Sequence, residues 1–187
     1  ACNDDSQVTI ARAGAVDPLV QLLRTGNAEG KANAAAALRN LAANNDDNQV
    51  AIMRAGAVDP LVQLLRSRDT EGKADVAAAL RNLAAHNNDN QSAIMRAGAV
   101  DPLMQLLRTG DAEEKAKAAG ALANLAAYNN ENQVAITRAG ALGPLVKLLR
   151  TGDAEGKVKA VGGAGQPRRS KQGQPGRHRQ GRRGGPP

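Results

Sequence analysis

Three asparagines recur at one place in a repeated motif, Leu-Xaa-Asn-Leu-Ala, and lie 42 residues apart: Asn40, Asn82 and Asn124. A side-chain amide has two N–H donors and an acceptor oxygen, so a row of amides can hold the backbone of an extended peptide whatever its side chains are. Each such hydrogen bond contributes about 0.5–1.5 kcal/mol net, so three of them give modest affinity and little selectivity. The alternative is that these amides brace neighbouring turns inside the fold, and the two roles are compatible.

Catalytic and metal-binding chemistry have no comparable pattern in this chain. The sequence holds two His residues, one Cys and scattered carboxylates, which form neither a metal-ligand spacing nor a catalytic triad. We expect His86 to be an exposed residue at a helix end. Cys2 cannot form an internal disulfide, which fits a reducing compartment. We therefore expect a noncatalytic protein without a cofactor, in the cytoplasm or the nucleus.

The segments that must position the asparagines repeat with the same period of 42 residues. The motif Ala-Gly-Ala-Val-Asp-Pro-Leu begins at Ala13, Ala55 and Ala97, and the variant Ala-Gly-Ala-Leu-Gly-Pro-Leu begins at Ala139. Apolar residues at helical spacing predict three helices in each unit. In the second unit these helices are expected at 48–55, 59–66 and 70–87.

Glycine marks the predicted end of the first helix, and aspartate and proline mark the predicted start of the second. Gly56 can turn the chain sharply after the first helix because glycine tolerates positive φ. We expect Asp59 to cap the second helix and Pro60 to fit its first turn. The many alanines of the third helix favour helix formation and allow neighbours to approach closely.

This pattern resembles the armadillo repeat family, through "NQVAIMRAGAVDPLVQLLRSRDTEGKADVAAALRNLAA" and its sister copies. The resemblance covers about residues 6–161 and is close to the vacuolar-protein-8-like and plant U-box-type arrays. HEAT repeats are the most similar alternative, but they have two helices and lack this spacing of Gly and Pro. The resemblance implies an all-α fold, a right-handed α-solenoid with three helices per 42-residue unit.

The period divides the chain into an armadillo array, residues 1–161, and a disordered basic tail, residues 162–187. Within the array we expect a partial repeat at 1–47, repeats at 48–89 and 90–131, and a truncated repeat at 132–161. The chain opens in the middle of a repeat, so we expect a fragment or an imperfect gene model. No stretch is apolar for long enough to span a membrane.

The resemblance also implies that the third helices line a concave groove, in which the asparagines of the motif reach the backbone of an extended peptide. The positions seven before and four after each asparagine should share its helix face. They differ between otherwise near-identical copies, so they carry either specificity or neutral drift on a solvated surface. The positions seven before hold Asn33, Asp75 and Lys117, and those four after hold Asn44, His86 and Tyr128.

One departure from the family pattern concerns the ligand. Relatives that carry nuclear import signals have a Trp four residues before the asparagine, where this chain has Ala36, Ala78 and Gly120. Without the indoles there is no slot for lysine stems and no cation–π surface, so we expect no binding of nuclear import signals. Arg39 and Arg81 adjoin the asparagines. They could favour an acidic ligand, or be solvated with their stems packed down.

The net charge of +7 comes from the tail. Seven of the 25 Lys and Arg residues lie in 161–187, which has no Asp or Glu, so the other 18 basic residues balance the 18 acidic ones. The charge therefore says nothing about the partners of the array. An alternative function is that the tail binds RNA electrostatically. It has no aromatic residue for base stacking, so we do not favour selected binding to nucleic acid.

The tail has the features of a frameshifted further repeat. The period predicts Ala-Leu-Ala-Asn-Leu-Ala from residue 163, and "GAGQPRR" at 163–169 can be coded by bases that give this segment when read one base later. In the same shifted frame, "QPGRH" at 174–178 becomes Asn-Gln-Val-Ala-Ile, and "QGRRGGPP" at 180–187 becomes Arg-Ala-Gly-Ala-Val-Asp-Pro-Leu. One extra base near Gly162–Gly163 accounts for all of these matches.

These patterns predict a noncatalytic scaffold that binds a protein or an extended peptide in the groove. Two alternatives are RNA binding by the tail, and a role as the substrate-recognition part of a larger ubiquitin-ligase-type protein. The fourth unit loses its pattern after Val161. We therefore expect Leu145, Leu148 and Leu149 to lack part of their cover, and end-to-end self-association to follow.

Overall fold

The computed structural model describes residues 4–67 and 71–151 of the chain. These residues form eleven helices and no strand, in four consecutive units. The first helices of the units are α1 (Asp4–Arg12), α4 (Asp46–Arg54), α7 (Asn88–Arg96) and α10 (Asn130–Arg138). The second helices are α2 (Val16–Thr25), α5 (Val58–Arg66), α8 (Val100–Thr109) and α11 (Leu142–Thr151). The third helices are α3 (Ala28–Ala42), α6 (Lys73–Leu83) and α9 (Ala112–Ala126).

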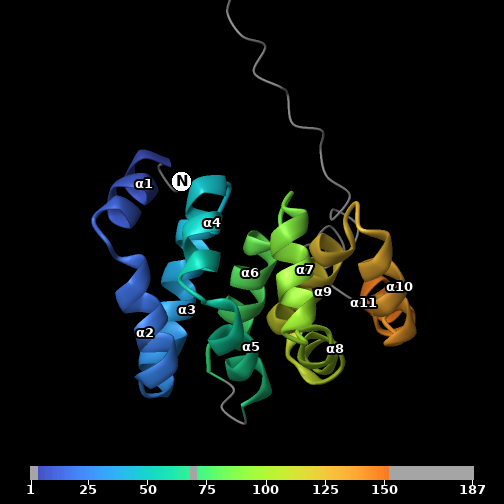
Figure 1. Ribbon diagram of the computed structural model, residues 1–187. Coiled ribbons are helices and arrows are strands. Elements are labelled where there is room, and N and C mark those ends of the chain that lie inside the picture. The colour runs from blue at the N-terminus through green and yellow to red at the C-terminus, as the bar shows by residue number, and fades with distance from the viewer. Residues whose placement is uncertain (1–3, 68–70, 152–187) are drawn as a thin grey trace, which may run out of the picture.

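The units are stacked side by side in chain order, from the blue α1 to the orange α10 (Figure 1). Successive third helices contact one another, α3 with α6 and α6 with α9, and successive second helices do the same. Leu38, Leu80 and Leu122, from one slot of the third helices, are almost completely buried in the core. The predicted all-α solenoid is confirmed, and residues 1–47, for which a partial repeat was predicted, carry all three helices.

The turn between the first and second helices is made as the sequence predicts, but the second helix is not capped as predicted. Gly56 has a φ of 74°, a left-handed conformation that favours glycine. The residue before α5 is Ala57, and no side chain caps the helix there. Asp59 lies inside the first turn with Pro60, so the expected capping role is wrong. Its carboxylate still suits the positive end of the helix dipole.

In the first three units, an arginine near the end of the second helix bonds to the next unit. The Nη2 atom of Arg24 donates to the carbonyl oxygen of Gly56 at 3.3 Å, and that of Arg66 donates to the carbonyl oxygen of Gly98 at 2.9 Å. Arg108 bonds to the carbonyl oxygen one residue earlier in the motif, that of Ala139, at 3.3 Å. These bonds satisfy carbonyl groups that the ends of the first helices leave without an intrahelical partner.

The third helix of the second unit is shorter than predicted. We expected a helix over 70–87, whereas α6 covers Lys73–Leu83. Gly72, directly before it, has a φ of 76°, and this left-handed conformation interrupts the helix on that side. His86, after its end, also has a positive φ, so the chain has already turned there.

The fourth unit exposes apolar side chains, at two of the three residues expected and also at one that was not. Leu145 and Leu149 are half-buried, whereas their counterparts Leu103 and Leu107 are buried, so these two lack part of their cover as predicted. Leu148 is buried, so the prediction is wrong for that residue. Val146 is also exposed, at 49%, whereas its counterpart Val62 is 1% exposed. End-to-end association through this face stays a prediction, which a monomer in light scattering at high concentration would contradict.

Two further expectations lie outside the described residues: the truncated third helix of the fourth unit and the frameshifted tail. Among the helices described, none is long and apolar enough to cross a membrane.

Candidate functional site

Two of the three recurring asparagines connect successive third helices. The Nδ2 of Asn82 on α6 donates to the carbonyl oxygen of Arg39 on α3 at 2.9 Å, and the Nδ2 of Asn124 on α9 donates to that of Arg81 on α6 at 2.8 Å. Both residues are partly exposed. An amide nitrogen carries two hydrogens, and no other group of the described residues bonds to either amide. Each side chain is therefore held by one bond and keeps an N–H and the Oδ1 for a further partner.

Asn40 occupies the same position in the first unit but bonds within its own helix. Its side chain is exposed, and its Oδ1 accepts hydrogen bonds from the Nε of Arg39 at 3.2 Å and the Nη2 at 3.0 Å. The bracing role that the sequence left open is thus present at Asn82 and Asn124, and the described residues give Asn40 no earlier third helix to brace.

A second set of amides, buried except for the exposed Gln133, was missed in the sequence analysis. The Nδ2 of Asn90 on α7 donates to the carbonyl oxygen of Leu83 at 2.9 Å, and the Nε2 of Gln91 donates to that of Ala84 at 3.1 Å. Equivalent bonds are made by Asn48, Gln49, Asn132 and Gln133. They satisfy carbonyl groups that the ends of the third helices leave unbonded. The signal in the sequence was the Asn-Gln pair, which recurs unchanged in each of these units.

The side chains seven residues before the asparagines give the groove different charges from unit to unit. Asn33 is exposed. Asp75 on α6 forms an ion pair with Arg39 on α3. Lys117 on α9 holds the same slot as Asp75 but pairs with Glu113 of its own helix at 3.5 Å.

Arg81, the counterpart of Arg39, lies over the neighbouring helix. A Cβ added to Gly120 on α9 would come within 2.9 Å of the Cδ of Arg81. The glycine therefore leaves room for the arginine stem at the position where import-signal-binding relatives have Trp. Unlike Arg39, Arg81 has no ion pair in the part of the chain that the structure describes.

The residues four after the asparagines do not lie on the third helices. Asn44, His86 and Tyr128 follow the helix ends and have φ values of 55°, 55° and 57°. The expectation that they share a helix face with the asparagines is wrong, because the helices end before they reach that position. Asparagine tolerates this left-handed conformation, whereas an aromatic residue adopts it rarely. Tyr128 is 72% exposed.

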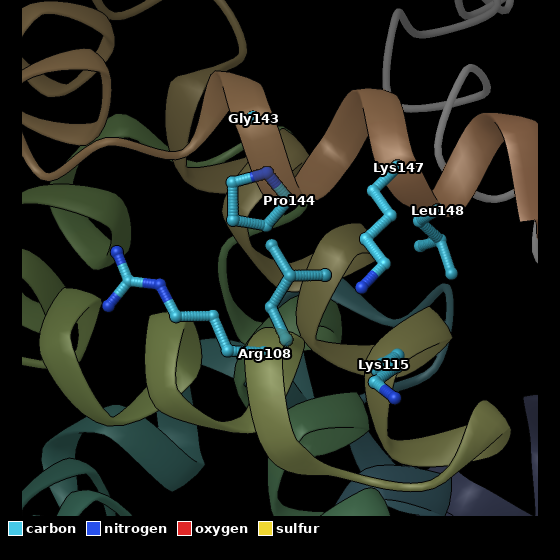
Figure 2. Close-up of a pocket in the computed structure, with 7 residues that line it drawn as sticks. Arg108, Lys115, Gly143, Pro144, Lys147 and Leu148 are labelled. Carbon is cyan, nitrogen blue, oxygen red and sulfur yellow. The ribbon is translucent and has the colours of Figure 1, made fainter.

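A pocket of about 250 Å³ lies elsewhere, between α8, α9 and α11 (Figure 2). It contains none of the groove residues predicted from the sequence. Figure 2 shows Arg108 extending away from Lys115 and Lys147, which agrees with its bond to the carbonyl oxygen of Ala139. In residues 4–67 and 71–151 no group of three His, Cys, Asp or Glu side chains could hold a metal ion.

Comparison with known families agrees with this geometry. The family model described as Armadillo/beta-catenin-like repeat matches residues 3–43, 45–85 and 87–127. The chain belongs to the armadillo repeat family. The three matches begin 42 residues apart, so they reproduce the period of the sequence, and each spans one three-helix unit of the array.

Solved armadillo structures resemble the chain along most of its length. A designed armadillo repeat protein is 39% identical with a TM-score of 0.80, over 86% of this chain and 68% of its own. A designed armadillo repeat protein in complex with the peptide (KR)4 is 36% identical with a TM-score of 0.78, over 85% of this chain and 66% of its own. An engineered protein is 39% identical with a TM-score of 0.78, over 84% of this chain.

The chain spans 64% of the length of that engineered protein, and about two thirds of the other two. Among curated proteins, none matches the chain.

Proposed function

We propose that the array is a noncatalytic scaffold that binds an extended peptide segment of a partner protein along α3, α6 and α9. The observation that carries this proposal is the geometry of Asn82 and Asn124. Each amide is held in place by one bond to the preceding third helix and keeps an N–H and an oxygen for a ligand. Groups that are fixed before binding lose less conformational entropy when a ligand arrives.

The comparison with solved structures supports the same use of the surface. A designed member of the family with a similar fold is described in complex with a peptide, and another is described as designed for modular peptide recognition. The asparagines stand at equivalent points of successive third helices, so a peptide backbone that runs along the stack meets both.

The test is to select octapeptides from a displayed random library and to measure their affinity for the full chain by fluorescence anisotropy. Replacing Asn82 or Asn124 with Ala should weaken binding about fivefold each, the equivalent of one net hydrogen bond. The matched control is Asn90→Ala, which removes a buried amide that faces the interior. It should lower stability and leave affinity unchanged at a temperature where both variants remain folded.

Two results would contradict the proposal. One is that no peptide is enriched over an unrelated helical protein. The other is that the affinity of an enriched peptide is the same in Asn82→Ala, Asn124→Ala and the unmodified chain, because the amides would then serve only as braces.

We further propose that the chain is close to vacuolar-protein-8-like and U-box-type arrays, in which case this surface would be the recognition part of a larger protein. Sequencing the transcript across Val161–Gly163 tests this extension. If the extra base is absent from the transcript, the array continues into further repeats. If it is present, the basic tail is made, and RNA binding that is lost on removing 163–187 would support the alternative function.

A further inference from the structure

We propose that the groove between α6 and α9 selects an acidic side chain, Asp or Glu, in an extended peptide, and that Arg81 and Lys117 recognise it. This proposal rests on the proposed function and names the chemistry of its ligand. It comes from a difference between two junctions, that of α3 with α6 and that of α6 with α9.

At the first junction the arginine is already neutralised. Arg39 on α3 forms an ion pair with Asp75 on α6, and both side chains are about one-third exposed. Glu71, which precedes α6, and Lys73, its first residue, are of opposite charge. The charges at this junction therefore balance, so an acidic ligand side chain meets no excess of positive charge here.

At the second junction the same positions carry the opposite charge. Arg81 replaces Arg39 one unit later, but the position of Asp75 is taken by Lys117. Two cations therefore occupy the positions that hold an ion pair at the first junction. The carboxylate that pairs with Lys117 is Glu113, 66% exposed and 3.5 Å away on the same helix. An exposed pair of this kind contributes little, so the second junction is positive in sum.

The surroundings of Arg81 direct it toward a ligand in the groove. Its stem crosses α9 at Gly120, and its own carbonyl oxygen accepts the hydrogen bond from Asn124. Arg81 therefore lies beside the two amides that are proposed to hold the peptide backbone. A guanidinium has five N–H donors and can grip a carboxylate with two parallel bonds. In the described part of the chain, no hydrogen bond from the Arg81 side chain to protein satisfies these donors, and the residue is half-exposed.

The test uses labelled octapeptides of alternating sequence, (Glu-Ala)4, (Gln-Ala)4 and (Lys-Ala)4, with the full chain and fluorescence anisotropy. We expect (Glu-Ala)4 to bind about fivefold to tenfold more tightly than (Gln-Ala)4, and (Lys-Ala)4 to bind most weakly. Arg81→Gln should remove the preference for Glu over Gln. The matched control is Arg39→Gln, the same substitution one unit earlier, which should keep the preference because Arg39 is already paired.

A second pair of variants exchanges the charges of the two junctions. Lys117→Asp gives Arg81 the partner that Arg39 has, so it should lower the affinity for (Glu-Ala)4 about tenfold. Asp75→Lys releases Arg39 and should raise the same affinity. The basic tail is common to all variants, so its attraction for the acidic peptide cancels in these comparisons. Circular dichroism on each variant checks that the helices are retained.

The outcomes separate this proposal from the one on which it rests. An unchanged preference for Glu in both Arg81→Gln and Lys117→Asp would overturn it and would attribute the preference to another part of the chain. Equal binding of the Glu and Gln peptides, weakened by Asn82→Ala, would also overturn it but leave the peptide-binding function standing. If none of the three peptides bound, both proposals would fail.

Discussion

The two rows of amides in this array use one chemical group in two ways. The Asn-Gln pairs that begin at Asn48, Asn90 and Asn132 bond to carbonyl oxygens at the ends of the third helices, and all but Gln133 are buried. Asn82 and Asn124 lie at the surface of the third helices and use one bond to reach the preceding unit. Burial decides the difference. A buried amide can bond only to groups of the protein, whereas a partly exposed amide can bond to the protein and to a ligand at the same time.

The largest expected effect is on the buried row. Replacing Asn90 with Ala removes the bond to Leu83 and leaves a carbonyl oxygen without a partner in the interior, so we expect the free energy of unfolding to fall by about 2 kcal/mol. Urea denaturation followed by circular dichroism measures it. The exposed neighbour Asn88 is the control, and Asn88→Ala should change stability by less than about 0.5 kcal/mol. Equal losses of unfolding free energy in Asn90→Ala and Asn88→Ala would contradict the structural role of the buried amide.

The half-exposed row should show a smaller loss of stability together with a loss of binding. Asn82→Ala breaks one bond between α6 and α3, so we expect the free energy of unfolding to fall by about 1 kcal/mol. The affinity for a selected peptide should fall in the same variant. A loss of stability without any loss of affinity would mean that Asn82 only braces α6 against α3 and does not bind the peptide.

A third use of asparagine appears at the ends of the third helices. Asn44 has a positive φ there, and the equivalent Tyr128 holds almost the same φ with a bulky side chain. Tyr128→Asn should therefore raise the free energy of unfolding by about 0.5 kcal/mol, measured by urea denaturation. The reverse change, Asn44→Tyr, should lower it by a similar amount. A loss of stability in Tyr128→Asn would mean that the exposed ring makes a stabilising contact that outweighs the backbone strain.

The smallest effect on stability is expected at Asn40. Its side chain is exposed and bonds to Arg39 next to it, so Asn40→Ala should change the free energy of unfolding by less than about 0.5 kcal/mol. Thermal melting can compare it directly with Asn82→Ala. If the two variants lost the same stability, the brace between helices would not explain the loss in Asn82→Ala.

The sequence predicted the architecture well because the period of 42 residues repeats every structural signal. Helix type, the turn at Gly56 and the stack of third helices follow from apolar spacing and glycine. The helix ends were less predictable, since Ala84 to Asn87 could continue a helix by local propensity and the chain instead turns at His86. The pairing of Arg39 with Asp75 depends on how two units are set against each other, which a single unit's sequence does not reveal.

The arginines of α2, α5 and α8 bond to the turn after the first helix of the next unit. These bonds, like those of Asn82 and Asn124, join only adjacent units. The array can therefore bend through small rotations at each junction between units, and these rotations add up along the stack. The junction closed by Arg39 and Asp75 has an ion pair that the junction at Arg81 lacks. A peptide bound across Arg81 and Lys117 would add contacts between α6 and α9, so binding would restrict rotation at that junction of the stack.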